Sequence, residues 1–215
     1  MCRQYTSVIE LIRLMSLLLM ESTVKSNMTI ITRDFEQKSL DQSRSFISTV
    51  GEIDWDEYKP TRAGILVYSI VNNRIHIGMG IDSRFKELTD FGGGIKYRKD
   101  GNALNAAMRE FFEETLYVFN PAELDSLEDC TIIYNAYTCV ILVQIHEDIH
   151  RISTLYRSRK AVLNRTEISK IEWIPIDRFT KMITSGRGIY ARISDLLRKT
   201  PRSIDKIIPK EAGCL

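Results

Sequence analysis

Apolar and polar residues alternate in a pattern that predicts regular structure from about residue 63 onward. Residues 65–71 are rich in β-branched and aromatic side chains, and residues 74–81 carry apolar side chains at every second position. Both patterns are typical of β-strands. Asn72 and Asn73 stand between them, and asparagine tolerates the positive φ that tight turns require. The two segments are therefore predicted to form a β-hairpin.

The next predicted element is a helix over residues 102–119, which Asn120-Pro121 ends. The basic segment 148–162 is compatible with either kind of element. The remaining expected elements are strands at 130–145 (one bent strand or two) and 171–174, and helices at 177–184 and 190–199. This order of strands and helices predicts an α/β fold in which helices cover a mixed sheet.

The first 60 residues differ from this pattern. Residues 8–20 are apolar, but Glu10 and Arg13 interrupt them, and the run is too short to span a bilayer. A short amphipathic helix is expected there, with a helix for a membrane surface or a protein partner as the alternative. Residues 21–60 are polar and read as a linker or loosely structured arm. The expected organisation is an N-terminal extension (1–60), one domain (61–200) and a C-terminal tail (201–215).

Composition and charge narrow the class of protein. Of 215 residues, 44% are hydrophobic and 27% charged, which is ordinary for a globular protein. The net charge of +2 indicates no dominant surface for nucleic acid or acidic membranes. Cys2, Cys130, Cys139 and Cys214 form no C-x-x-C pair or zinc ligand set, and Cys139 is expected to be a buried thiol. We infer a reducing, cytoplasmic compartment.

The strongest chemical signal lies on the predicted helix at 102–119. Glu110, Glu113 and Glu114 are spaced i, i+3, i+4 and fall on one narrow face, opposite an apolar face. Arg109 is one cation beside these three acids. A solvated acidic face is the plain alternative, but like charges at this spacing repel each other. A divalent cation explains the cluster better, and oxygen ligands of this kind suit Mg²⁺ or Mn²⁺.

Three successive glycines, Gly92–Gly94, precede this helix. Glycine lets the backbone form a tight turn and approach a ligand closely, and its amides or carbonyls can face a phosphate or a metal. The small residues Ala103, Ala106 and Ala107 would let a ligand or a strand come close to the helix. A glycine-rich segment followed by Arg-Glu-x-x-Glu-Glu on a helix is a much stronger signal than glycines alone.

This combination resembles the Nudix box, G-x5-E-x7-R-E-U-x-E-E-x-G-U, in which U is a bulky apolar residue. Most of the box is supplied by Gly94, Arg109, Glu110, Phe111, Glu113 and Glu114. Counted back from Arg109, Gly101 occupies the position of the first glutamate, beside Asp100, and Gly94 fits if the loop is one residue longer. Leu116 replaces the last glycine, so the helix is expected to continue through Phe119. The resemblance covers about residues 63–184 and implies a Nudix-type α/β/α sandwich.

The resemblance also implies an activity, the hydrolysis of a pyrophosphate bond in a nucleoside diphosphate linked to another moiety. That moiety would be a nucleotide, a nucleotide sugar, a dinucleotide or an RNA cap. Glu110, Glu113 and Glu114 would hold Mg²⁺ or Mn²⁺ together with a carbonyl of Gly93 or Gly94, and one glutamate, for which we favour Glu113, would also activate water. Arg109 would brace the glutamates. Glu167, in a loop before the last strand, is the candidate for a fourth ligand or general base, with a plain surface role as the equal alternative.

Two other hypotheses stay open. A non-catalytic Nudix-like nucleotide-binding or regulatory module is supported by Gly101, and an unrelated α/β domain with an acidic helix is the third. Arg157, Arg159, Lys160 and Arg165 form a basic cluster that binds phosphates or only solvates a loop. A small-molecule nucleotide is the expected partner, with RNA only as a capped end. No stable membrane insertion is expected, and a homodimer is an open alternative.

Overall fold

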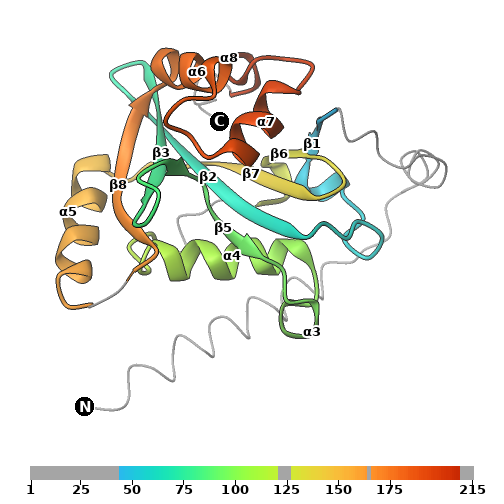
Figure 1. The fold of residues 1–215 in the computed structure, drawn as a ribbon, viewed down its shortest axis with the longest axis horizontal. Coiled ribbons are helices and arrows are strands. Elements are labelled where there is room, and N and C mark those ends of the chain that lie inside the picture. Colours follow the sequence, from blue (N-terminus) through green and yellow to red (C-terminus); the bar gives the residue numbers. More distant parts are fainter. Residues whose placement is uncertain (1–43, 121–126, 164–165, 209–215) are drawn as a thin grey trace. The chain divides into compact units, whose positions relative to one another are not determined.

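The computed structural model describes residues 44–120, 127–163 and 166–208, which build a mixed β-sheet with helices on both faces (Figure 1). The strands are β1 (Phe46–Thr49), β2 (Arg62–Val71), β3 (Arg74–Asp82), β4 (Leu88–Thr89), β5 (Phe91–Gly94), β6 (Thr131–Tyr134), β7 (Thr138–Gln144) and β8 (Ile168–Pro175). Their order is β1-β6-β7-β2-β3-β4, with β5 paired to β2 and β8 to β3. β2 and β7 run parallel, and the predicted mixed α/β architecture is confirmed.

The helices of the described residues are the 3₁₀ turns η1 (Val50–Glu52) and η3 (Leu127–Asp129) and the α-helices α3 (Tyr97–Asp100), α4 (Ala103–Glu114), α5 (Ile149–Lys160), α6 (Ile176–Ser185), α7 (Ala191–Arg198) and α8 (Ile204–Ile207). Segment 148–162 is thus a helix, with Asp148 as its N-cap. In the described residues, no helix is long and apolar enough to cross a membrane. The helix expected at residues 8–20 lies outside the described residues.

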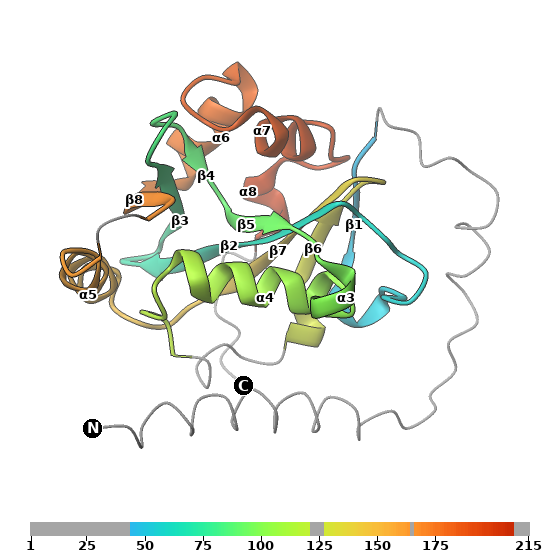
Figure 2. The same cartoon turned by 60° about the horizontal axis from the view of Figure 1, so that its bottom comes forward.

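The sheet separates two helical layers (Figure 2). Helix α4 packs on β2 and β5, whereas α6 packs on β3, β8, α7 and α8. Alternate residues of β2 point toward one or the other helical layer, because successive side chains of a strand point to opposite faces of the sheet. Leu66 and Tyr68 join the core beneath α6 and α7, together with Phe179 and Leu196. This core therefore lies on the face opposite α4.

The predicted hairpin is confirmed. β2 and β3 pair antiparallel from Val67↔Gly78 to Val71↔Arg74, and Asn72 and Asn73 have φ values of 51° and 58°. Nearer the start of β2, the two strands diverge. β5 pairs with that part of β2, and β4 pairs with the end of β3. The segment from Leu88 to Gly94 thus fills the wedge between the two strands, and Asp90 lies where it passes from one partner to the other.

Three expectations were wrong. Residues 46–60 are not a loose arm, because β1 pairs with β6 from Phe46↔Tyr134 to Thr49↔Thr131. The tail after residue 200 is not separate from the domain, since Ile204 and Ile208 join the main core. The helix at 102–119 stops at Glu114, because the next turn adopts left-handed backbone. The division into extension, domain and tail is therefore kept only as a proposal, with its first boundary before residue 46.

The cysteine prediction is confirmed where the structure describes it. Cys139 lies in β7 and is fully buried, and burial raises the pKa of its thiol to about 12. Such a thiol stays protonated and unreactive at neutral pH. Cys130 is half-buried, while Cys2 and Cys214 lie outside the described residues.

Candidate active site

Helix α4 is held close to the sheet by small and aromatic side chains. Ala103, Ala106 and Ala107 are fully buried, so they admit the strands rather than a ligand. Phe111 follows on the same side and meets Phe91 of β5 edge-on, with 5.7 Å between ring centroids. This packing fixes the helix lengthwise against β5 and leaves its acidic side facing the glycines.

The glycines before the helix are extended strand rather than the tight turn that we predicted. Gly92, Gly93 and Gly94 have no positive φ, and they pair with Gly64, Ala63 and Arg62 of β2. Their lack of a side chain serves close approach instead. A Cβ on Gly93 would lie 2.6 Å from the carboxyl carbon of Glu110. Gly92 and Gly93 are thus explained by the room that they leave for the backbone of β2 and a carboxylate of α4, whereas a Cβ on Gly94 would meet nothing within 4 Å.

Arg109 connects the acids around the start of the helix. Its Nη1 donates to Glu110 Oε1 at 2.6 Å and to Glu113 Oε2 at 3.1 Å. Its Nε and Nη2 donate to the two carboxylate oxygens of Asp100 at 2.8 and 3.1 Å. Asp100 contributes most to raising the pKa of the guanidinium. Arg109 therefore contacts the glutamates, in the geometry expected of a bracing residue.

Asp100 corrects the expected loss of the first acid of the box. Five residues separate Gly94 from Asp100, which is the spacing between the first glycine and the first glutamate of the box. The segment between Asp100 and Arg109 is one residue longer than in the box. Gly101 absorbs that residue, because it ends α3 with a φ of +78°, and Asn102 then caps α4. The hydrogen bond from Arg109 is the main cause that lowers the pKa of Asp100. The acid is thus present, one position earlier than the count from Arg109 placed it.

Glu114 is a half-buried glutamate at the end of α4. Its Oε2 accepts a hydrogen bond from the amide of Gly92 at 2.8 Å. Burial is the main cause that raises the pKa of Glu114 to about 9, and the charge of Asp90 adds to it. The Gly92 amide and Arg62 oppose this rise only in part. A buried carboxylate in such surroundings is ready to accept a cation, either a proton or a metal.

Arg62 and Asp90 form a buried pair behind Glu114 that the sequence analysis missed. Arg62 donates to both carboxylate oxygens of Asp90 at 2.6 and 2.8 Å and to the carbonyl of Gly92 at 2.9 Å. Burial by itself lowers the pKa of Arg62, but the charge and hydrogen bond of Asp90 raise it overall. The sequence shows only a charged residue at the start of an apolar strand and an acid close to the glycine triplet. No rule of sequence spacing predicts that these two residues pair with each other.

Glu110 and Glu113 face Arg109, and Glu113 is half exposed. Among the described residues, no group of three acidic, histidine or cysteine side chains already converges as a metal cage. Arg109 Nη2 also lies 3.5 Å from the carbonyl oxygen of Gly94, at the outer limit of a hydrogen bond. The metal ligands expected from sequence therefore lie around one glycine strand, with Arg109 between two of them.

Glu167 lies at the same site, as the sequence suggested. It lines a cavity of about 370 Å³. The other lining residues include Arg62, Asp82, Gly92, Gly93, Gly94, Glu114, Tyr190 and Arg192. The loop is tied to the end of β3, since the Ser83 amide donates to the Glu167 carbonyl at 2.7 Å. The structure thus brings Glu167 and Glu114 together across 53 residues of sequence.

The basic cluster has a different role from the phosphate binding considered above. Arg159 Nη1 donates to the carbonyl of Leu116 at 2.7 Å and also to that of Tyr117. Lys160 donates to the carbonyl of Ser169, and Arg157 donates to the carbonyl of Ser153. These cations therefore hold backbone in the described structure, while Arg165 lies outside it.

The turn after α4 explains what Arg159 does. Leu116 and Tyr117 both have a φ of 56°, the left-handed region that disfavours residues with a side chain. Leu116 occupies the position where the Nudix box has glycine. Arg159 bonds both carbonyls of this turn and so compensates its strain from helix α5. The last glycine of the box is replaced by a leucine that adopts the backbone of a glycine.

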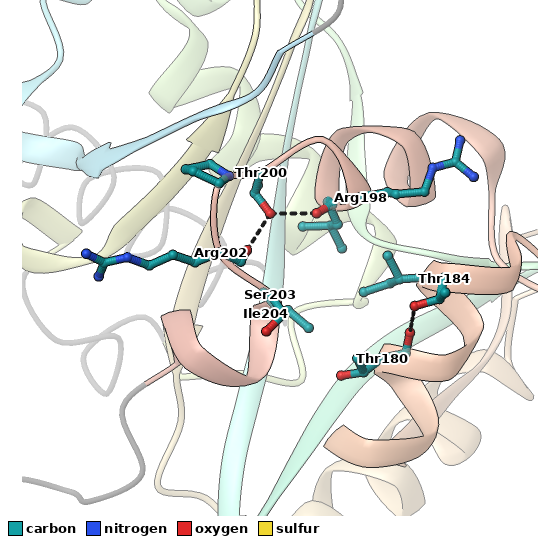
Figure 3. A pocket seen from close by; sticks show the side chains of 10 residues that line it. Thr180, Thr184, Arg198, Thr200, Arg202, Ser203 and Ile204 are labelled. Carbon is teal, nitrogen blue, oxygen red and sulfur yellow. Dashed lines mark hydrogen bonds between the residues drawn. The ribbon is translucent and has the colours of Figure 1, made fainter.

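A second cavity of about 190 Å³ lies among α6, α7 and α8. It is lined by Arg198 and Arg202, but Figure 3 shows both guanidinium groups directed away from the space between the helices. Thr180 and Thr184 donate their hydroxyls to helix carbonyls at 2.9 Å. These groups offer no site for an anion, so the cavity at Glu114 is the better candidate.

No family model matches the chain, and no curated protein sequence matches it. Solved structures similar to it include an Ap4A hydrolase from C. elegans, with a TM-score of 0.41 and 18% identity over 64% of this chain and 92% of that one. The Nudix domain of NrtR from Shewanella oneidensis, complexed with ADP ribose, has a TM-score of 0.34 and 11% identity over 60% and 82%.

A Nudix hydrolase from Nitrosomonas europaea is similar as well, with a TM-score of 0.33 and 16% identity over 72% of this chain and 99% of that one. These are Nudix proteins, the family that the segment from Gly94 to Glu114 resembles. Likeness of this degree does not assign an activity or a substrate.

Proposed function

We propose that this protein is a divalent-metal-dependent hydrolase of the Nudix type that cleaves a pyrophosphate bond in a nucleoside diphosphate derivative. The observation that carries the proposal is Glu114. It is a buried carboxylate with a raised pKa, it lies at a cavity beside a glycine strand, and a second acid, Glu167, lines the same cavity. Bringing two acids to one cavity is costly without a cation to balance their charges.

The residues present fit a divalent metal. Glu110, Glu113 and Glu114 offer oxygen ligands from one helix, and Gly93 leaves room beside the Glu110 carboxylate. Oxygen-only donors favour Mg²⁺ or Mn²⁺ over softer metals. The bound metal would neutralise the charge of the diphosphate and lower the pKa of a water molecule. The cofactor proposed is therefore Mg²⁺ or Mn²⁺.

The chain's own groups take separate roles in this proposal. Glu110, Glu113 and Glu114 hold the metal, and the carbonyl of Gly94 is a further oxygen donor. Arg109 is a positioning residue, because it bonds both Glu110 and Glu113 and is itself anchored on Asp100. Glu113, half exposed at the end of this chain of contacts, orients or deprotonates the attacking water.

Glu167 is proposed as the fourth ligand or as the general base. Its exposure supports a role that requires contact with water, and its loop is held by Ser83, whose hydroxyl donates to the carbonyl of Thr166 at 2.8 Å. Asp148 has no comparable position, since its side chain accepts a hydrogen bond from the His150 amide as the cap of α5. The loop acid is therefore favoured over the acids before α5.

The test is hydrolysis of a panel of nucleotides by the full chain in Mg²⁺ or Mn²⁺. The panel contains Ap4A, ADP-ribose, a nucleotide sugar and a capped RNA, because the proteins of similar structure include an Ap4A hydrolase and a domain complexed with ADP ribose. Glu113→Gln and Glu114→Gln should each abolish turnover. Glu57→Gln, at an exposed position on another part of the surface, should not.

Two results would contradict the proposal. Turnover that survives both glutamate substitutions would place the catalytic centre elsewhere. Nucleotide binding without turnover of any substrate would favour a binding or regulatory module. That alternative has lost its main sequence argument, because Asp100 supplies the acid that Gly101 was thought to replace.

A further inference from the structure

The cavity at Glu114 has an uneven distribution of charge. Three acids line it, Asp82, Glu114 and Glu167, and two cations, Arg62 and Arg192. Arg62 already forms a buried ion pair with Asp90. Within the described ranges, Arg192 has no carboxylate as an ion-pair partner, and its guanidinium carbon lies 5.9 Å from the ring centroid of Tyr190. Arg192 is therefore the lining cation whose charge is left to balance an anion.

The backbone fixes the residues around Arg192 at the cavity. The Leu88 amide donates to the Gly188 carbonyl at 3.0 Å, and the Tyr190 amide donates to the Leu88 carbonyl at 2.8 Å. This pairing joins the segment before α7 to β4. Ile189 and Ile193 are buried, and Tyr190 and Arg192 lie at the cavity. The position of Arg192 thus depends on strand pairing and core packing rather than on a free loop.

We propose that Arg192 binds a phosphate of the substrate at the part of the cavity formed by α7, and that Tyr190 positions its guanidinium. The inference rests on the proposed function and adds to it a residue that selects for phosphate. A derivative with more than two ionised phosphates, such as Ap4A, carries more negative charge than one divalent metal ion neutralises, and the acids of the cavity repel the remainder. A guanidinium pairs well with phosphate, because its N–H groups match two phosphate oxygens.

Arg192 lies outside the segment that resembles the Nudix box, and α4 and α7 lie on opposite faces of the sheet (Figure 2). The two groups of residues therefore reach the cavity from different layers. In this arrangement the carboxylates of α4 act at the bond that is hydrolysed, and Arg192 of α7 recognises a phosphate of the substrate. Substrates with an additional phosphate should gain most from Arg192.

The test compares Arg192→Gln, Arg192→Lys and a control, Arg178→Gln, at an exposed position of α6 outside the cavity. Arg192→Gln should raise KM roughly 10- to 100-fold for the hydrolysed nucleotide, the effect of losing a charged hydrogen bond, with kcat changed little. Arg192→Lys should recover part of this loss. Tyr190→Phe should behave as the wild type, while Tyr190→Leu should raise KM.

A direct binding measurement separates this inference from the proposed function. The Kd of ADP is measured by calorimetry for the wild type, Arg192→Gln and Arg178→Gln, each checked for folding by circular dichroism. Weaker ADP binding by Arg192→Gln alone supports the phosphate site even if no substrate is turned over. An unchanged Kd and KM would overturn the inference while leaving hydrolysis by the wild type, and hence the proposed function, intact.

Discussion

Asp100 accepts two hydrogen bonds from the guanidinium of Arg109, across a loop that is one residue longer than the Nudix spacing. The contact shows that an insertion between an acid and its arginine can be absorbed without losing their pairing. Gly101 makes this possible through its positive φ, which turns the chain between α3 and α4. Asp100 and Arg109 are thus paired although their spacing differs by one residue from that of the Nudix box.

Asp100→Asn should destabilise the protein by about 1–3 kcal/mol, because it weakens a charged hydrogen bond to a guanidinium. The pKa of Asp100 is lowered in the folded state, so its stabilisation is present at neutral pH and is lost as the pH falls through that lowered value. Urea unfolding at pH 7 and in acid measures both effects. Asp56→Asn, at an exposed position, is the control, and equal stability of the two variants would contradict the prediction.

Gly93→Ala should lower metal affinity roughly 10-fold or more, as changes around metal ligands generally do. The new methyl carbon would lie 2.6 Å from the Glu110 carboxyl carbon, so that flexible side chain must move. Gly94→Ala is a matched control, since its Cβ would meet nothing within 4 Å. Titration with Mn²⁺ compares the two variants. Equal affinities would show that the position of Glu110 is unimportant for the metal.

Glu114→Gln should change the pH dependence of stability in the absence of metal. The folded protein holds a proton on Glu114 up to a pKa of about 9, while the unfolded chain releases it near the ordinary value of 4.5. Stability of the wild type therefore falls as the pH rises between these values, because the folded state binds more protons. In EDTA, the stability of the variant relative to the wild type should increase from pH 5 to pH 9. Parallel stability curves for the two proteins would refute this origin.

Leu116→Gly should stabilise the protein by about 1 kcal/mol, because glycine relieves the left-handed backbone at this position. Arg159→Met should destabilise the wild type more than it destabilises the Leu116→Gly variant, since the strain that Arg159 offsets is then smaller. Thermal unfolding of the two single variants and the double variant measures this coupling. Leu163→Gly, at an exposed residue without a positive φ, should give no gain. Strict additivity of the two substitutions would contradict the compensation.

Local patterns predicted much of this molecule. Strand alternation and Asn72-Asn73 located the central hairpin, and the spacing of Glu110, Glu113 and Glu114 located the acidic helix. Glu167, which lines the cavity with Glu114, was proposed as a site residue because it precedes the last strand, where the resembling family carries an acid. Each of these inferences depends on residues that are close in sequence or on a known order of elements.

The features that were missed depend on pairing between distant segments. The sequence predicts a loose arm in place of β1, because this strand is defined only by its pairing with β6. The sequence predicts a turn at the glycine triplet, because no neighbouring residue indicates that β2 and Glu110 lie so close to the glycines. The ion pair of Arg62 with Asp90 likewise forms only when β5 lies on β2.

The wedge between β2 and β3 has a consequence for how ligand binding would spread through the domain. The segment from Leu88 to Gly94 completes the hydrogen bonding of both strands, and its Gly92–Gly94 end lines the cavity. A ligand that orders the glycines must also steady the Leu88 end, and Leu88 is bonded to the segment before α7. Occupation of the cavity would therefore slow amide exchange on both sides of the sheet, so that helix layers on opposite faces respond to one ligand.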